Sequence, residues 1–363
     1  MTSASRLRRG GIAVVLAAVL AVALIVSLSV GLLTTRASAA PELPPVTPEQ
    51  LVASVVAAEP VALAGTVAVD NRLGLPAVPG LPSDGLTDGT STARVWSDGK
   101  GDGRLAVPSD DGERTYVRDG ATTWAYDSTD RTATRFPSRG HAPDADAAKD
   151  PAEVARTVVA RLSATSVLRV DGTTEVAGRP AYTLVLAPKP GERTVLREVR
   201  AAVDAQTRTP LELTVLGAGT DPVLRIGFDD VTFGPQDPAL FTFTPPPGAT
   251  VRDGTAGTVK QPGPGIRPGP ANPGTGSPGS TPARAAAPTV VGEGWDTVVV
   301  GRVPQRSGDG QGPDLSALGT PVSGPWGAGR EITTNAGSVI LADDGRVAAG
   351  AVGPDVLGEA LAR

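Results

Sequence analysis

Residues 119–136 read DGATTWAYDSTDRTATRF, two short alternating runs separated by a polar turn. Asp119-Gly120 is a turn signal, and Trp124 and Tyr126 stand two positions apart, which places both side chains on one face of a strand. Two similar turn signals, residues 97–99 (SDG) and 110–112 (DDG), precede this stretch. The spacing predicts an antiparallel meander that continues to about residue 136.

Two segments have the signature of a capped helix. Residues 47–50 (TPEQ) combine a threonine N-cap, a proline at the first helical position and a capping-box glutamine. Residues 150–153 (DPAE) begin a second helix, because apolar residues follow them at helical spacing. Each predicted helix is short, so together they cover only a small area of sheet.

Strand signals resume after the second helix, and each strand has one apolar face with period two. Such strands form an antiparallel sheet that is covered on one side, and we expect it to curl around the two helices. The predicted fold class is α+β, a curled antiparallel sheet in the form of an incomplete β-barrel with covering helices. The apolar faces consist of Tyr182, Leu184 and Leu186; Leu211, Leu213 and Val215; Leu224, Ile226 and Phe228; and Phe241 and Phe243.

The amino-acid composition of the sequence changes after residue 252. Thirteen of the 23 residues from 261 to 283 are proline or glycine, which predicts a linker over residues 253–287. Strand patterns return in residues 295–303 (WDTVVVGRV) and in residues 337–352, which read as a hairpin about Asp343-Asp344-Gly345. A terminal helix is predicted over residues 354–361. Residues 288–363 therefore form a small C-terminal α+β domain in this prediction.

The N-terminus predicts export. Residues 12–33 carry no charge and would form a helix about 33 Å long, enough to cross a membrane. A basic flank precedes them, which directs the rest of the chain outside. Ala37, Ser38 and Ala39 form an A-x-A cleavage pattern. Residues 1–39 are therefore either a signal peptide or a transmembrane anchor, and the protein is secreted or anchored facing outside, in the cell envelope.

Composition excludes several function classes. The net charge of −5 argues against a nucleic-acid partner, and the absence of cysteine excludes a diacylated lipoprotein. One histidine cannot build a usual zinc site. The stretch from Asp98 to Gly103 lacks the calcium-loop pattern and is interpreted as a turn. We expect no metal, no cofactor and no catalytic residue, and so no enzyme; a secreted hydrolase would need two ionisable groups facing one cleft.

Residues 71–84 (NRLGLPAVPGLPSD) form an unusually apolar loop. Such a loop gains nothing from exposure, and it contains too many prolines for a strand or a helix. Two interpretations stay open: its large apolar side chains pack on the protein's own core, or they border a site for an apolar ligand.

Three stretches resemble the LolA-type lipoprotein carriers. Residues 119–136 are similar to the family's strand–turn–strand, residues 203–215 (VDAQTRTPLELTV) to its hairpin, and residues 240–251 (LFTFTPPPGATV) to its closing strand and exit. The resemblance covers residues 45–252. The added C-terminal domain resembles the architecture of the RseB/MucB relatives, which regulate envelope stress by binding an anti-sigma factor.

The resemblance implies an apolar half-barrel cavity that shields the acyl chains of a lipid or lipoprotein. The function it implies is therefore non-catalytic lipid or lipoprotein binding outside the cytoplasm. The alternative is an envelope-stress sensor whose C-terminal domain binds a membrane protein partner. The candidate residues of the cavity and its rim are Leu73, Leu75, Val78, Leu81, Trp96, Trp124, Tyr126, Leu184, Leu213, Ile226 and Phe241.

Overall fold

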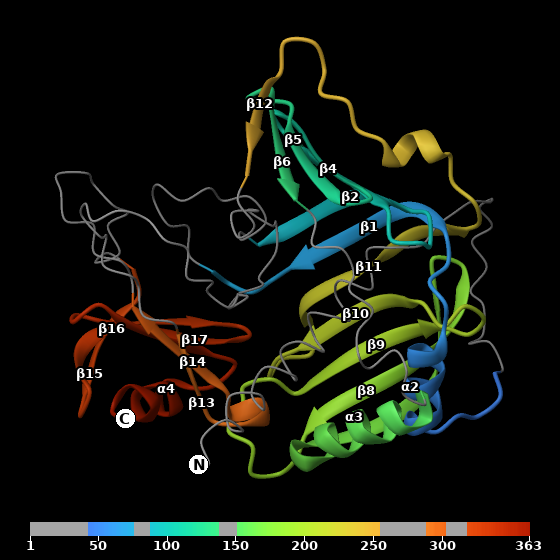
Figure 1. Cartoon of the computed structure of the whole chain (residues 1–363). Coiled ribbons are helices and arrows are strands. Elements are labelled where there is room, and N and C mark those ends of the chain that lie inside the picture. Colours follow the sequence, from blue (N-terminus) through green and yellow to red (C-terminus); the bar gives the residue numbers. More distant parts are fainter. Residues whose placement is uncertain (1–42, 76–87, 138–150, 255–287, 303–317) are drawn as a thin grey trace, which may run out of the picture.

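The computed structural model describes residues 43–75, 88–137, 151–254, 288–302 and 318–363 (Figure 1). The predicted N-terminal span, most of the linker, and Val78 and Leu81 lie outside these ranges. No helix in the described ranges is both long and apolar enough to cross a membrane.

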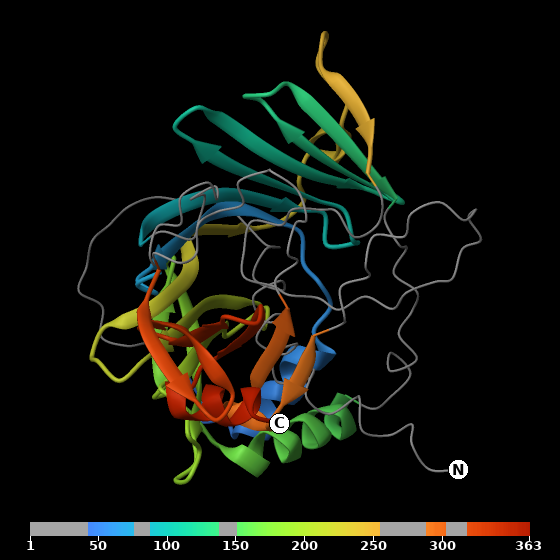
Figure 2. The ribbon, with the colours of Figure 1, turned by 90° about the vertical axis from the view of Figure 1, so that its left-hand side faces the viewer.

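Twelve strands of the described chain form one large sheet, which curls without closing into a barrel (Figures 1 and 2). The predicted curled antiparallel sheet is confirmed, except that β12 pairs with β6 in parallel. The sheet order is β12-β6-β5-β4-β3-β2-β1-β11-β10-β9-β8-β7. The strands are β1 (Leu63–Asn71), β2 (Gly89–Ser97), β3 (Gly103–Ser109), β4 (Gly112–Asp119), β5 (Thr122–Asp127), β6 (Thr132–Pro137), β7 (Ser166–Val176), β8 (Arg179–Pro188), β9 (Glu198–Asp204), β10 (Pro210–Leu216), β11 (Pro222–Phe233) and β12 (Thr250–Asp253).

The helices α2 (Pro48–Ala57) and α3 (Pro151–Thr165) lie on the concave side of this sheet, near β7 and β8 (Figure 1). The predicted capping box of α2 is present: the Gln50 N–H donates to Thr47 Oγ1 (3.2 Å), and the Thr47 N–H donates to Gln50 Oε1 (2.9 Å). Leu51 of α2 is buried in a cluster with Tyr182 of β8 and Val203 of β9. The helices therefore cover one end of the concave face.

Phe241 and Phe243 do not lie on a strand, so that part of the prediction is wrong. Residues Pro238–Phe241 form a 3-10 helix, η1. Asp237 caps it, since its carboxylate accepts from the Ala239 N–H (2.9 Å), and prolines 245–247 then remove the backbone donors that a strand needs. The ring of Phe243 lies 5.4 Å from that of Trp124 and 5.8 Å from that of Tyr126.

The described C-terminal residues form a second, antiparallel sheet of six strands, in the order β13-β14-β18-β17-β16-β15. The hairpin about residues 343–345 and the terminal helix α4 (Pro354–Leu361) lie where the sequence predicts them. Trp326, Ile340 and Leu357 belong to the core between the sheet and α4. The strands are β13 (Thr289–Val291), β14 (Val298–Arg302), β15 (Thr320–Gly324), β16 (Gly327–Thr334), β17 (Gly337–Ala342) and β18 (Arg346–Gly350), and a 3-10 helix, η2 (Gly294–Asp296), precedes β14.

The two sheets are joined by direct hydrogen bonds. Asn335, in the turn between β16 and β17, donates its backbone N–H to the carbonyl of Leu73 (2.8 Å) and its side-chain amide to that of Arg72 (2.7 Å). The Val195 N–H, in the connection from β8 to β9, donates to the carbonyl of Ala351 (3.0 Å). The C-terminal residues therefore contact the large sheet where β1 ends and where β9 begins.

Gly217 allows the close approach of the two sheets, and we expect Gly217→Ala to loosen it. A Cβ at this position would lie 2.6 Å from the backbone oxygen of Asn335 and 3.1 Å from Val223 Cγ1. Such a clash typically costs about 1–3 kcal/mol. Denaturation and hydrogen exchange of the Asn335 amide measure the effect. Gly219→Ala is the matched control, because nothing lies within 4 Å of its Cβ; equal behaviour of the two variants would contradict a contact role for Gly217.

Candidate functional site

The concave face of the large sheet carries two adjacent cross-strand rows of apolar side chains. The strand registers define them, because directly paired residues share a face and positions two apart repeat it. Neighbouring rows are about 7 Å apart along the strands. The inner row is Val170, Leu184, Ala201, Leu213, Ile226 and Val69, and the outer row is Leu168, Leu186, Val199, Val215 and Leu224.

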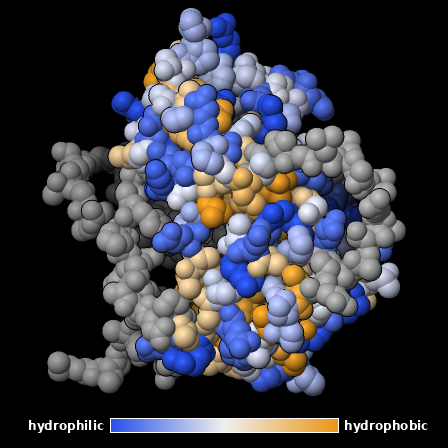
Figure 3. Space-filling view, turned by 90° about the vertical axis from the view of Figure 1, so that its right-hand side faces the viewer, coloured by the Kyte–Doolittle hydropathy of each residue, from blue (hydrophilic) through white to orange (hydrophobic). Residues whose placement is uncertain are grey.

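The two rows differ in exposure only in the middle of the inner row, because Val170, Leu184, Ile226 and Val69 are half-buried like the outer row. Leu213 and Ala201 in the middle of the inner row are buried, each 5% exposed. All five residues of the outer row are half-buried, so each still presents apolar surface. With strands about 4.8 Å apart, the outer row spans about 19 Å across five strands. Figure 3 shows apolar residues gathered in the middle and lower part of one side of the molecule, among polar ones.

The opposite, convex face of the same strands is polar. Arg200 and Arg169 both donate to Glu198 (2.8 and 3.2 Å). Arg225 donates to Glu212 (2.9 Å) and to Asp70 (3.4 Å). Burial acts to raise the pKa of Glu198, but the hydrogen bonds from Arg200 and Arg169 outweigh it and hold that pKa below its usual value. The predicted amphipathic character of the strands is thus explained: ion pairs line the convex face and apolar rows the concave one.

The registers separate the predicted cavity residues into two groups. Leu184, Leu213 and Ile226 lie in the inner row on the concave face. Trp96, Trp124 and Tyr126 share the convex face. When the pairing is followed from Val69 strand by strand, each of them stands an odd number of positions from the residue that continues the inner row, so its side chain points to the other face. No single cavity wall contains both groups, and the ligand role of each residue stays a prediction.

The aromatic residues of the convex face have protein partners. Trp96 is half-buried, and the guanidinium groups of Arg94 and Arg104 lie 5.6 and 6.0 Å from its ring centre. The rings of Trp124 and Tyr126 pack against Phe243. Phe241 is buried at the end of η1. Leu73 and Leu75 are half-buried directly after β1, next to the contact with Asn335.

The sequence predicts only part of the outer row. Leu186, Val215 and Leu224 were on the predicted apolar faces, but Leu168 and Val199 were not recognised. The alternation of apolar and polar residues in β7 and β9 is the sequence pattern that could have identified Leu168 and Val199. Which residues meet across strands depends on register, which the turns set at a distance from the row.

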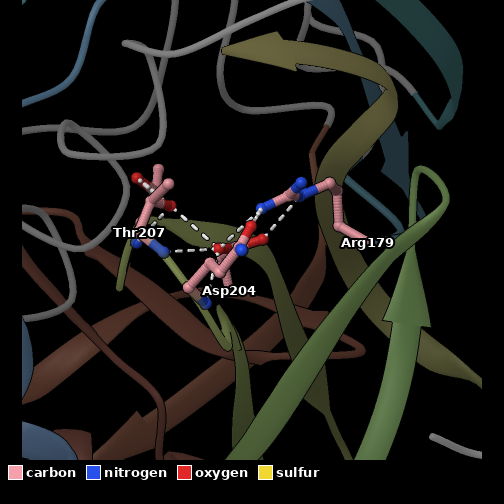
Figure 4. A network of polar contacts seen from close by, with 5 residues as sticks. Arg179, Asp204 and Thr207 are labelled. Carbon is pink, nitrogen blue, oxygen red and sulfur yellow. Dashed lines mark hydrogen bonds and ion pairs between the residues drawn. The ribbon is translucent and has the colours of Figure 1, made fainter. Parts of the chain in front are cut away.

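A polar network joins the start of β8 to the end of β9, at the edge of these strands that lies away from the second sheet (Figure 4). Asp204 is fully buried and accepts two hydrogen bonds from Arg179 (2.8 and 3.1 Å) and two from Thr207 (2.6 and 3.0 Å). Burial acts to raise the pKa of Asp204, but the bonds from Arg179, Thr207 and Gln206 outweigh it and hold that pKa below its usual value. This carboxylate is therefore ionised and structural at neutral pH.

A cavity of about 310 Å³ lies where the two sheets meet. Glu192, Arg193, Asp296 and Glu359 line it, together with apolar residues that include Val356. Arg193 donates to both oxygens of Glu359 (2.8 and 3.0 Å), and this bond holds the pKa of Glu359 below its usual value. The charges on the cavity wall thus pair with one another across the contact between the sheets. In the described ranges, no group of three or more acidic or histidine side chains is placed to hold a metal ion.

No protein-family model matches the sequence, and a search of curated proteins finds no match either. Solved structures similar to this one include MucB of Pseudomonas aeruginosa in its complex with MucA, at 17% identity over 86% of this chain and 94% of that chain, with a TM-score of 0.42. A LolA superfamily protein from Nitrosomonas europaea is similar at 12% identity over 55% of this chain and 99% of that chain, with a TM-score of 0.24. LprF from Mycobacterium bovis is similar at 11% identity over 55% and 96%, with a TM-score of 0.28.

These neighbours confirm the predicted resemblance to LolA-type and MucB structures. At such identities and scores the likeness concerns the fold alone. What the chain binds has to be argued from its own residues.

Proposed function

We propose that this chain is an exported, non-catalytic binding protein that holds the acyl chains of a lipid or lipoprotein against the concave face of its large sheet. In this proposal residues 45–252 form the binding domain, residues 253–287 a linker and residues 288–363 a second domain. The observation that carries it is the outer row, five half-buried apolar side chains on five neighbouring strands. Apolar side chains that are neither fully buried in the core nor fully exposed to water are suited to contact an apolar ligand.

The driving force would be transfer of acyl carbons out of water. Each buried methylene contributes about 0.8 kcal/mol. Partial burial of one acyl chain along the outer row is therefore sufficient for micromolar binding, since that affinity corresponds to about 8 kcal/mol. The convex face also has a pocket of about 310 Å³, but Arg200, Arg225 and Glu212 line it, so we expect the acyl chain on the concave side.

Native mass spectrometry of the full chain from a bacterial host, followed by organic extraction, tests the proposal. Acylated species that co-purify, and that compete with an added fluorescent fatty acid, would support it. They would also identify the chemical class of the ligand. A ligand-free mass with no fatty-acid uptake would count against the proposal.

The second candidate function is a sensor that reports ligand binding to a membrane protein partner through the C-terminal residues. The contacts between the two sheets favour it, because they lie beside the outer row. Leu186 and Val199 flank the connection from β8 to β9, and Val195 in that connection donates to Ala351. A ligand that moves these strands would also move the contact.

If the two sheets are coupled in this way, we expect an acyl ligand to change hydrogen exchange at the Val195 and Asn335 amides by about tenfold or more. Both amides donate to carbonyls of the other part of the chain, so their protection reports on the contact. Mass-spectrometric or NMR hydrogen exchange with and without oleate measures it. The Leu213 amide in β10 is the internal control. Ligand binding that leaves both contact amides unchanged would favour a simple carrier over a sensor.

A further inference from the structure

Arg208 lies on the concave side of the sheet, in the turn between β9 and β10. Its guanidinium carbon is 5.3 Å from the ring centre of Tyr182, which is buried in the cluster with Leu51 of α2. Tyr182 stands two positions before Leu184 on the same face of β8. Arg208 therefore places a cation beside the inner row, on the side away from the outer row and near α2.

This arginine is incompletely satisfied. Its Nη1 is buried and is one of three side-chain atoms in the described ranges that are buried without a hydrogen-bond partner. A buried guanidinium N–H without an acceptor is costly, and natural structures rarely leave one. An acceptor brought by a ligand would remove this cost.

The neighbouring acceptors are already in use. The Asp204 carboxylate accepts from Arg179, from Thr207 and from the Gln206 N–H (2.9 Å). The Tyr182 hydroxyl contacts the carbonyl of Pro44 (3.0 Å), to which it donates its only proton. Neither the Asp204 carboxylate nor the Tyr182 hydroxyl accepts a hydrogen bond from Arg208, whose guanidinium lies over the Tyr182 ring on the helix side of the sheet.

The backbone also holds Arg208 in an unusual conformation. Its φ is +62°, in the left-handed region that residues other than glycine seldom adopt, and its N–H donates to the carbonyl of Asp204 (3.2 Å). The Asp204 network around the turn stabilises this conformation. Such positions are retained where the surrounding structure fixes them, and here the turn directs a long cationic side chain toward Tyr182.

We infer that the ligand is an anionic amphiphile, whose carboxylate or phosphate binds the Arg208 guanidinium while its acyl chain crosses the inner and then the outer row along β8 toward Leu186. The inference rests on the proposed function and names the chemical class of its ligand. An arginine pairs well with either anion, because its N–H groups match two acceptor oxygens. The distance from Tyr182 to Leu186 along β8 is about 14 Å, which leaves the chain in contact with both rows.

The test compares three ligands with the same oleoyl chain: oleate, oleoyl lysophosphatidic acid and neutral monoolein. Binding of each to the full chain is measured by calorimetry for the wild type, for Arg208→Gln and for Arg252→Gln. Glutamine keeps the Cβ, so the backbone strain at position 208 is unchanged. Arg252 is an exposed arginine on the edge strand β12, and it serves as the matched control.

We expect Arg208→Gln to weaken the binding of oleate, of lysophosphatidic acid or of both by about tenfold to a hundredfold, as for a hydrogen bond to a charged group. Monoolein binding should change by less than about twofold, and Arg252→Gln should leave all three unchanged. The anion that loses more identifies the headgroup. An equal loss for all three ligands, or no loss for either anion, would overturn the inference and leave acyl-chain binding intact. Failure of the wild type to bind any of the three would overturn the proposed function itself.

Discussion

Asp204→Asn is expected to destabilise the folded chain by about 3–5 kcal/mol. The Asp204 side chain is 0% exposed, and Arg179 is held by it through two hydrogen bonds. Asparagine removes the negative charge. It also replaces one of the two carboxylate oxygens that accept from Arg179 with an NH₂ group, which cannot accept a hydrogen bond. Arg179 then keeps a partly buried charge without its counter-ion, beside the ring of Phe233 at 4.9 Å. Chemical denaturation measures the loss.

An exposed ion pair provides the matched control. Arg135 and Asp253 pair at 2.8 Å, but their side chains are 53% and 76% exposed. We expect Asp253→Asn to cost at most about 1 kcal/mol, because water screens the pair and already solvates both ions. The double variant Arg179→Met with Asp204→Asn should regain part of the loss, since no charge is then left unpaired. Equal losses for Asp204→Asn and Asp253→Asn would contradict a buried ion pair.

The same carboxylate makes stability depend on pH. The pKa of Asp204 is lower in the folded chain than its usual value, so the folded state binds this proton less readily than the unfolded state. Its contribution is therefore fully present above the unfolded pKa of about 4 and is lost as the pH falls through the folded pKa. The stability difference between wild type and Asp204→Asn should accordingly shrink below about pH 4.

The elements that the sequence predicts well are those with local causes. The capping box at Thr47 and Gln50 needs only two residues that are three positions apart, and the turn at Asp343-Asp344-Gly345 needs only three consecutive residues. The stretch from Pro238 to Phe241 was predicted incorrectly because its apolar alternation resembles a strand. Asp237 and the prolines that follow decide otherwise, through one cap bond and missing backbone donors.

The candidate site was predictable only in part, because its rows form between strands distant in sequence. Period two correctly placed Leu184, Leu213 and Ile226 on apolar faces, and sheet order then brought them into one row. The same periodicity gave no indication that Trp124 faces away from them, since that depends on the registers of the four to seven strands that lie between β5 and these residues. Arg208 had no sequence signal, because its position depends on a turn conformation and on Tyr182.

The double variant Leu186→Gln with Leu224→Gln is expected to weaken acyl-chain binding by about a hundredfold. Both residues belong to the outer row and are half-buried. Removing two leucine side chains from a binding surface forfeits about 1.5 kcal/mol each, and each 1.4 kcal/mol is a factor of ten in affinity. The unfolding transition should shift far less than it does for Asp204→Asn, because neither side chain is sealed in the core. Displacement of a fluorescent fatty acid and thermal denaturation measure the two effects together.

Two exposed valines provide a control for the loss of apolar surface in general. Val167 is 46% exposed on the convex side of β7, and Val251 is 53% exposed on β12. Their replacement by glutamine should leave binding within about twofold of wild type. If the double leucine variant unfolds, Leu186→Ala with Leu224→Ala retains the test with a smaller change. Equal affinity of the row variants and the valine variants would mean that the outer row is ordinary surface, and the ligand would then have to be sought at the contact between the sheets, where Arg193 pairs with Glu359.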